Sequence, residues 1–210
     1  MSRRQGVIDE ILARRVSAII RTRDQQLAAD AMRAAVDGGF KIVEFTLTTP
    51  GALELVAAFS KRDLLVGAGT VLNREQARQA TQAGARFLVS PICDPEIIAE
   101  ARALDVVAIP GTFTATEMET AHRAGADFCK LFPAPADVPG YIRSILGPLP
   151  HLRIFPTNGV TLDNLHQTLA AGAAGVGFVN ALFAAEWLEA RDFDAIRRRA
   201  AELISRAASV

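Results

Sequence analysis

Short apolar runs alternate along the whole chain with longer segments of helical periodicity. One kind of apolar run follows a glycine that ends a helical segment, and it occurs at 37–45, 82–90, 123–131 and 170–178. Glycine is the residue expected just past a helix C-terminus, where the backbone turns left-handed. A second kind of run lies between the first, at 16–22, 64–70, 106–112 and 153–159. The pattern therefore predicts eight strands, each followed by a helical segment.

Strands that alternate with helices pair in parallel, and eight such units close naturally into a barrel. The predicted fold class is α/β, a (β/α)8 TIM barrel formed by a single domain over residues 1–210. An open doubly wound sheet is the alternative. Residues 5–14 predict a short extra N-terminal helix that covers the bottom of the barrel. Capping signals predict helix starts at Asp24, Thr49-Pro50, Asn73, Asp94, Thr114, Thr161 and Asp192.

Composition and charge narrow the range of partners. The chain has 23 basic and 23 acidic residues, and this zero net charge argues against general electrostatic capture of nucleic acid or of an anionic membrane. The first residues lack a signal-peptide core, and no run approaches the roughly 20 apolar residues of a membrane span. We therefore expect a cytoplasmic protein that binds neither nucleic acid nor membrane, with Cys93 and Cys129 as free thiols in strands.

Lysine is informative because it is rare, with three lysines against 20 arginines. Lys41 and Lys61 precede strands, whereas Lys130 lies inside the apolar run 128–133, near the C-terminal end of a strand. In a barrel of this type, the active site lies at that end. A lysine removed from water has a lowered pKa, which makes its amine nucleophilic enough for Schiff-base chemistry. A structural lysine paired with a carboxylate is the alternative.

Glu44 is the candidate proton carrier. Alternation places Glu44, Thr46 and Thr48 on one face of their strand, and this polar face points into the barrel because the opposite face is apolar. A carboxylate beside a buried lysine is either a simple ion pair or a proton shuttle.

Arg21 and Thr70 each end a predicted strand. A guanidinium at the rim suits a substrate carboxylate, and the alternative is a solvent-exposed arginine that binds no substrate. The Thr70 hydroxyl and nearby amides could hold the same carboxylate, with glycines that let the backbone approach closely. The ends of the last two strands, 156–160 and 177–181, occupy the usual phosphate position of a barrel but are not glycine-rich. Neither a metal cluster nor a catalytic triad is evident, because all three histidines fall on helices or a loop.

Five motifs in order over nearly the whole chain resemble the 2-keto-3-deoxy-6-phosphogluconate (KDPG) aldolases and their 2-keto-3-deoxy-6-phosphogalactonate (KDPGal) relatives, a group that includes 4-hydroxy-2-oxoglutarate aldolases. The motifs are Val43-Glu-Phe-Thr-Leu47, Val66-Gly-Ala-Gly-Thr-Val-Leu-Asn73, Val89-Ser-Pro91, Ile109-Pro-Gly111 and Phe128-Cys-Lys-Leu-Phe-Pro-Ala134.

The resemblance implies class I aldolase chemistry on a keto-acid substrate. It makes Lys130 the Schiff-base lysine and Glu44 the general acid and base, places Thr70 near the pyruvate carboxylate, and lines the pocket with Pro91 and Phe132. The implied reaction splits a 2-keto-3-deoxy-6-phospho sugar acid into pyruvate and glyceraldehyde 3-phosphate. The resemblance further implies that no metal or organic cofactor is needed and that the chain forms a homotrimer.

The sequence departs from the family pattern at three places. Many KDPG aldolases have an arginine where this chain has Thr48, whereas the KDPGal type is similar to this chain in carrying one at the end of the first strand, here Arg21. The expected Thr-Gly-Gly turn reads Thr157-Asn158-Gly159, and the glycine- and serine-containing loop of the last strand reads Val179-Asn180. We expect Thr157, Asn158, Gly159 and Asn180 to bind substrate.

These changes leave two alternative functions open. The first is the same imine chemistry on an unphosphorylated 2-keto-4-hydroxy acid, or decarboxylation of oxaloacetate. The second is a barrel that binds a keto acid without catalysis, and the presence of both Lys130 and Glu44 argues against it.

Overall fold

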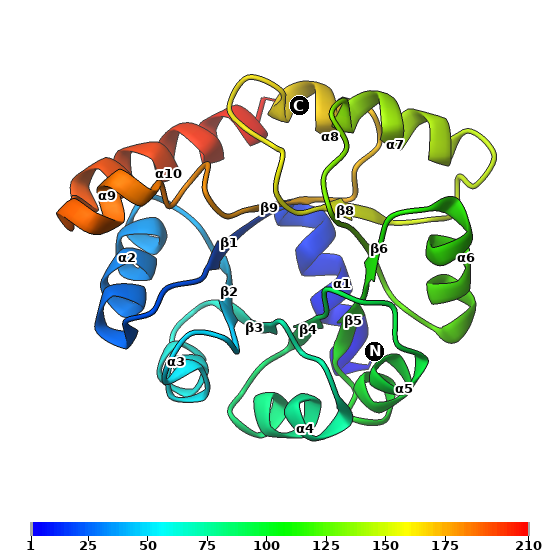
Figure 1. Ribbon diagram of the computed structural model, residues 1–210, viewed down its shortest axis with the longest axis horizontal. Coiled ribbons are helices and arrows are strands. Elements are labelled where there is room, and N and C mark those ends of the chain that lie inside the picture. Colours follow the sequence, from blue (N-terminus) through cyan, green and yellow to red (C-terminus); the bar gives the residue numbers. More distant parts are fainter. Residues whose placement is uncertain (1, 210) are drawn as a thin grey trace.

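Strands surround the centre of the molecule and helices cover them on the outside, in a computed structural model that describes residues 2–209 (Figure 1). The strands are β1 Val16–Ile20, β2 Ile42–Thr46, β3 Leu65–Gly69, β4 Phe87–Val89, β5 Val107–Ile109, β6 Gly111–Thr112, β7 Cys129–Leu131, β8 Ile154–Pro156 and β9 Val176–Phe178. The helices are α1 Arg3–Arg14, α2 Gln25–Asp37, α3 Ala52–Phe59, α4 Arg74–Gln82, α5 Pro95–Ala103, α6 Ala115–Ala124, α7 Val138–Leu146, α8 Leu165–Ala170, α9 Ala185–Ala190 and α10 Phe193–Ala207.

All strand pairings are parallel, and they form a curved α/β arrangement. One sheet has the order β5-β4-β3-β2-β1-β9, and a second has the order β6-β7-β8. Pro110 alone separates β5 from β6, so the fifth predicted strand is present as two pieces. Proline has no N–H to donate to a strand ladder, and this explains the break. On the other side of the second sheet, an isolated parallel bridge joins Thr157 to Gly177 of β9.

The repeated glycines adopt the left-handed backbone that the sequence predicts. Gly39, Gly84, Gly125 and Gly172 have φ between 98° and 112°, and each lies between a helix and the following strand. The predicted caps Asp24, Asn73, Asp94, Thr114 and Asp192 each accept a hydrogen bond from a backbone N–H in the first turn of their helix. These local signals therefore set the boundaries between strand and helix.

The structure moves two predicted helix starts and adds one. The helix expected after Thr49-Pro50 begins after Gly51, and the one expected at Thr161 begins at Leu165. Asp137, which the sequence prediction missed, caps α7 through the backbone N–H of Gly140. Both cysteines are free, but Cys93 lies in the loop between β4 and α5 rather than in a strand.

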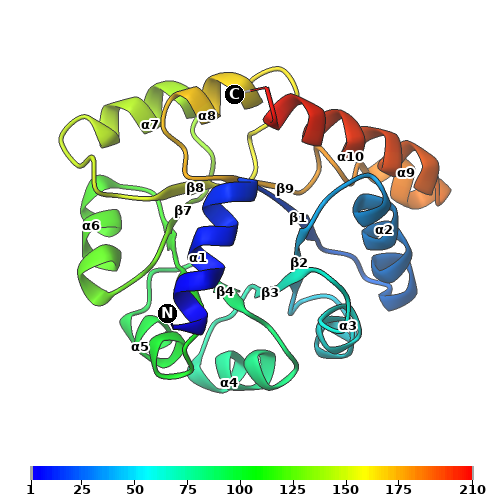
Figure 2. The same ribbon diagram turned by 180° about the vertical axis from the view of Figure 1, so that it is seen from behind.

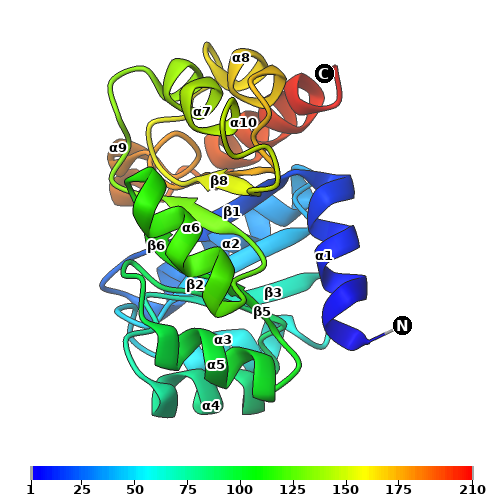
Figure 3. The same ribbon diagram turned by 90° about the vertical axis from the view of Figure 1, so that its right-hand side faces the viewer.

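Helix α1 crosses the end of the fold at which the strands begin, as the sequence predicts for residues 5–14 (Figures 2 and 3). Its buried side chains Val7, Ile8 and Ile11 form one apolar cluster with residues from the beginnings of the strands, namely Ile42, Leu65, Phe87, Val107, Phe128 and Phe155. A larger cluster lies between the strands and the outer helices. The end of the interior at which the strands begin is thus filled mainly with apolar side chains, whereas Glu44 and Thr46 lie toward the opposite end.

Candidate active site

A cavity of about 210 Å³ opens at the carboxyl ends of the strands. Its floor and walls come from β1, β2 and β7 and from the residues that directly follow β1, β3, β7, β8 and β9. The lining residues are Ile19, Arg21, Glu44, Thr46, Thr70, Lys130, Phe132, Thr157, Asn158, Val179 and Asn180. Residues that are far apart in the sequence, from Ile19 to Asn180, therefore line one cavity.

Lys130 reaches this cavity from the middle of β7. Its neighbours Cys129 and Leu131 are buried in the cluster shared with the helices, so alternation turns Lys130 toward the barrel axis. Burial lowers the pKa of Lys130, the nearby Glu44 raises it, and the positive charge of Arg21 lowers it further. The Lys130 Nζ also lies 4.8 Å from the centre of the Phe132 ring. A larger share of this amine is thus neutral, and nucleophilic, than in an exposed lysine.

Glu44 lies on β2, and its side chain is only 3% exposed. Burial raises the pKa of Glu44 to about 7, although the positive charges of Lys130 and Arg21 oppose the rise. Gly69 of β3 makes room for the carboxylate, because a Cβ at this position would collide with Glu44 Oε1. Gly67 leaves space for the Phe87 ring in the same way. These glycines therefore leave room for side chains of the neighbouring strands.

Glu44 and Lys130 influence each other without direct pairing. No Lys130 nitrogen lies within 4.0 Å of a Glu44 oxygen, so the simple ion pair considered above is absent between these two described residues. Their pKa values are displaced toward each other, the acid upward and the amine downward. Groups with such displaced pKa values in one cleft are suited to proton transfer near neutral pH.

Arg21 and Thr70 meet at the rim of the cavity. Arg21 directly follows β1, and its Nη2 donates a hydrogen bond of 3.3 Å to Thr70 Oγ1. Thr70 directly follows β3 and has a φ of 58°, a left-handed conformation that is uncommon for a β-branched residue. Strained backbone of this kind gathers at ligand sites, where the surrounding structure holds it in place.

The part of the cavity wall formed after β8 and β9 carries no charged side chain. Thr157 directly follows β8, is 3% exposed, and has a hydroxyl with no hydrogen-bond partner among residues 2–209. Asn158 and Gly159 are both left-handed, with φ of 74° and 72°, so Asn158 preserves the turn as expected. Arg21 and Lys130 are the two cationic side chains that line the cavity, and they come from the end of β1 and from β7, the strands on either side of this wall.

The structure gathers most of the predicted site residues but not all. Pro91 and Gly159 do not line the cavity. Pro91 instead packs with its carbonyl against Gly111, where a Cβ would collide with it. Gly159 shapes the turn, and a Cβ there would meet Ala134 Cβ at 2.5 Å. The sequence analysis missed Ile19 as a lining residue, although alternation from Arg21 along the same strand would have identified it.

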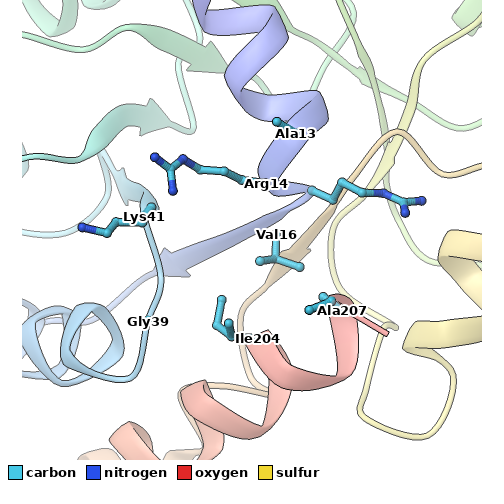
Figure 4. A pocket seen from close by; sticks show the side chains of 9 residues that line it. Ala13, Arg14, Val16, Gly39, Lys41, Ile204 and Ala207 are labelled. Carbon is cyan, nitrogen blue, oxygen red and sulfur yellow. The ribbon is translucent and has the colours of Figure 1, made fainter. Parts of the chain in front are cut away.

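Other hollows on the molecule lack such chemistry. Figure 4 shows one of about 370 Å³ at the beginning of β1, beside Arg14, Lys41 and the end of α10. Arg14 pairs there with Glu10, and Lys41 pairs with Asp63. Another hollow holds His122 and His151, whose ring centres are 4.9 Å apart, and His151 hydrogen-bonds with Glu119. Residues 2–209 contain no group of three or more His, Cys, Asp or Glu placed to hold a metal ion, and no helix among them has the length and apolarity to cross a membrane.

Residues 7–199 match the protein family described as KDPG and KHG aldolase. The 2-dehydro-3-deoxy-6-phosphogalactonate aldolase of Escherichia coli (strain K12) is 38% identical over 175 residues, which cover 80% of this chain and 84% of that protein. The 2-dehydro-3-deoxy-phosphogluconate aldolase of Treponema pallidum (strain Nichols) is 39% identical over 159 residues, covering 74% of this chain and 76% of that protein.

The fold is similar to that of a KDPG aldolase from Legionella pneumophila, whose crystal structure has pyruvate captured at low pH as a covalent carbinolamine intermediate. The TM-score is 0.82 at 25% sequence identity, and the match covers 94% of this chain and 97% of that one. The similarity therefore extends over nearly the whole of both chains.

Proposed function

Because the chain belongs to the KDPG and KHG aldolase family, we propose that Lys130 and Glu44 carry out its class I aldolase reaction in the cavity at the strand ends. The protein is a carbon–carbon lyase that cleaves a 2-keto-3-deoxy-6-phospho sugar acid to pyruvate and glyceraldehyde 3-phosphate. The observation that carries the assignment of residues is the shared cavity, in which burial lowers the pKa of an amine and raises the pKa of an acid to about 7.

The reaction begins at the Lys130 nitrogen. The neutral amine adds to the C2 carbonyl carbon of the substrate, and the resulting carbinolamine loses its oxygen as water to form a protonated imine. Glu44 is the group in the cavity that can supply the proton for the departing water, because a pKa of about 7 keeps part of it protonated near neutral pH.

Cleavage uses the imine as an electron sink. Ionised Glu44 removes the proton of the C4 hydroxyl, the C3–C4 bond breaks, and its electron pair moves to form the enamine of pyruvate. Glyceraldehyde 3-phosphate leaves with the new carbonyl at C4. The same carboxyl then returns a proton to C3, and water hydrolyses the imine to release pyruvate and free Lys130. One group serves as base and then as acid because both of its forms are populated.

Trapping with a reductant tests this assignment directly. Incubation with pyruvate and borohydride should leave a permanent adduct, and mass spectrometry of peptides should place it on Lys130. Cleavage of the phosphorylated substrates, compared between the two C4 epimers, measures the reaction itself. A protein that forms no adduct and cleaves neither epimer is not an aldolase, and it would then fit the non-catalytic keto-acid-binding barrel.

Arg21 is the proposed partner of the substrate carboxylate. Its guanidinium lines the cavity and already donates to Thr70. Replacing Arg21 with alanine should raise the half-saturating concentration of pyruvate for imine trapping by about tenfold or more, because a charge-assisted hydrogen bond is lost. The experiment measures adduct yield against pyruvate concentration, and unchanged affinity would exclude this role.

A second candidate substrate is an unphosphorylated 2-keto-4-hydroxy acid, or oxaloacetate for decarboxylation. The wall after β8 and β9 favours it, because these strand ends hold the usual phosphate position of a barrel and supply no cationic side chain to the cavity. The ratio of kcat/KM for phosphorylated and unphosphorylated substrates decides between the candidates. A strong preference for the phosphorylated acid excludes the second.

The two sheets further support a closed (β/α)8 barrel. Only Pro110 interrupts the junction of β5 with β6. At the other junction, Ala174 N donates to Ile154 O at 2.9 Å, and Asn158 N donates to Gly177 O at 3.4 Å. Hydrogen exchange measures this closure: protection of the Ala174 N–H comparable to that of the central strands is expected, and fast exchange contradicts it.

The family resemblance also supports a homotrimer in the cytoplasm. Leu72, Ile92 and Phe113 are exposed large apolar side chains that follow three strands at the same end of the fold, as expected of a surface covered in an assembly. Sedimentation of the intact protein measures its size, and a monomeric mass contradicts the trimer.

A further inference from the structure

Thr46 lies between the two groups proposed to hold the substrate carboxylate. Strand β2 is flanked by β1 and β3, and the register pairs Phe45 with Ile20 on one side and Thr46 with Gly69 on the other. Arg21 and Thr70 are the next residues along those two neighbouring strands. Their hydrogen bond therefore spans the end of β2, at the level of Thr46. The Thr46 side chain is 2% exposed and lines the same cavity.

The Thr46 hydroxyl belongs to a chain of hydroxyl groups that also includes Thr48 and Thr49. The Thr22 N–H donates to Thr49 Oγ1 at 3.2 Å, and Thr49 Oγ1 lies 3.2 Å from Thr46 Oγ1. A hydroxyl has one proton, and the Thr49 hydroxyl is buried with no other acceptor among residues 2–209. The arrangement that gives the buried Thr49 proton an acceptor has Thr49 donating to Thr46, and the Thr46 oxygen then accepts.

The remaining neighbour of Thr46 allows its proton to turn into the cavity. Thr48 Oγ1 lies 3.1 Å from Thr46 Oγ1. Thr48 is exposed, so water can donate a hydrogen bond to its hydroxyl or accept one from it. When Thr48 donates, both lone pairs of Thr46 are used, and the Thr46 proton has only the cavity left. On the other side, the Thr70 oxygen accepts from Arg21, which leaves the Thr70 proton free to donate as well.

From this arrangement we infer that the Thr46 hydroxyl donates a hydrogen bond to the substrate carboxylate, together with Arg21 and Thr70, and that Thr49 is the positioning residue that aims it. The inference rests on the proposed function, since it concerns the keto acid bound at Lys130. Thr49 acts at two points, because the same hydroxyl that donates to Thr46 also accepts the backbone N–H next to Arg21. Two donors from different strands are thus held by one buried side chain.

The test compares two ketones that differ in the carboxylate. Pyruvate and acetone both form an imine that borohydride traps on a reactive lysine, but only pyruvate has an anion to bind. Replacing Thr46 with valine keeps the shape of the side chain and removes the hydroxyl. The half-saturating concentration for trapping should rise about tenfold for pyruvate, because a hydrogen bond to a charged group is lost, and should stay within about twofold for acetone.

Thr168→Val is the matched control. Thr168 is also a fully buried threonine, but it lies on α8 outside the cavity, and its hydroxyl has no partner among residues 2–209. This variant should trap both ketones as the unchanged protein does. An equal loss for pyruvate and acetone in Thr46→Val would show a general distortion of the site and overturn the inference, as would no loss for either.

Thr49 is tested by rescue. Thr49→Val should reproduce the selective loss for pyruvate, and Thr49→Ser, which restores a hydroxyl, should recover most of the affinity. A valine variant that loses pyruvate affinity without recovery in the serine variant contradicts the positioning role. Failure of the aldolase assignment looks different from these outcomes, because the unchanged protein would then form no adduct with pyruvate at all.

Discussion

Replacing Lys130 with alanine is expected to abolish the borohydride-trapped pyruvate adduct and to lower kcat/KM for aldol cleavage by at least roughly a thousandfold. The reaction has no covalent route without this amine, because Lys41 and Lys61 both precede strands, at the end of the fold remote from the cavity. Mass spectrometry of the trapped protein and a coupled assay for pyruvate release measure the two effects.

Two companion variants separate chemistry from folding. Lys61→Ala removes an exposed lysine and should leave trapping and turnover unchanged. Lys130→Met keeps the length of the side chain but removes a buried amine whose charged form burial disfavours, so the fold should be at least as stable as before. If an inactive Lys130→Met protein melts well below the unchanged protein, the loss of activity reflects structural damage, and if Lys130→Ala still forms the adduct, another nucleophile is used.

Glu44→Gln is expected to separate imine formation from turnover. Glutamine fills the same space but carries no transferable proton, so the variant should still trap pyruvate, more slowly because water must supply the proton for dehydration, while kcat falls by about 10²- to 10⁴-fold. The unchanged protein should gain activity as pH rises through about 7, where Glu44 ionises and can act as a base. In the variant, kcat should no longer rise as pH passes through about 7. If the rise remains, a group other than Glu44 causes it.

The same substitution should stabilise the protein at high pH. The pKa of Glu44 is raised from 4.5 to about 7 in the folded chain, so the folded state holds its proton more tightly than the unfolded state. Stability from this group is therefore fully present below pH 4.5 and is lost as pH rises through 7. Glu44→Gln should unfold like the unchanged protein at pH 4 and be more stable by up to about 3 kcal/mol at pH 8. Denaturant titrations at the two pH values measure the difference.

Local features of the chain were enough to predict the order of elements. Each glycine after a helix needs a left-handed backbone, and each capping residue satisfies N–H groups of its own first turn, so both signals act within a few residues. The same holds for Lys130, because an apolar run on both sides makes it face the barrel axis. The break at Pro110 and the cap at Asp137 also have local causes, and the prediction overlooked them.

The composition of the site depended on the tertiary structure. Sequence alone indicated that Lys130 and Glu44 belong together, but the space that Gly69 leaves for the carboxylate is visible only when β2 lies beside β3. The same applies to Thr46, whose place between Arg21 and Thr70 follows from the register of three strands.

The chain by itself therefore determined which segments become strands and helices and which strand bears the amine, since backbone preference and alternation act between near neighbours. Only the tertiary structure decided the causes of the Glu44 and Lys130 pKa shifts, the contacts of the Thr46 hydroxyl with Thr48 and Thr49, and the exclusion of Pro91 and Gly159 from the cavity lining. Desolvation, charge interaction and hydrogen bonding act through space, and the groups concerned come from strands that are far apart in the chain.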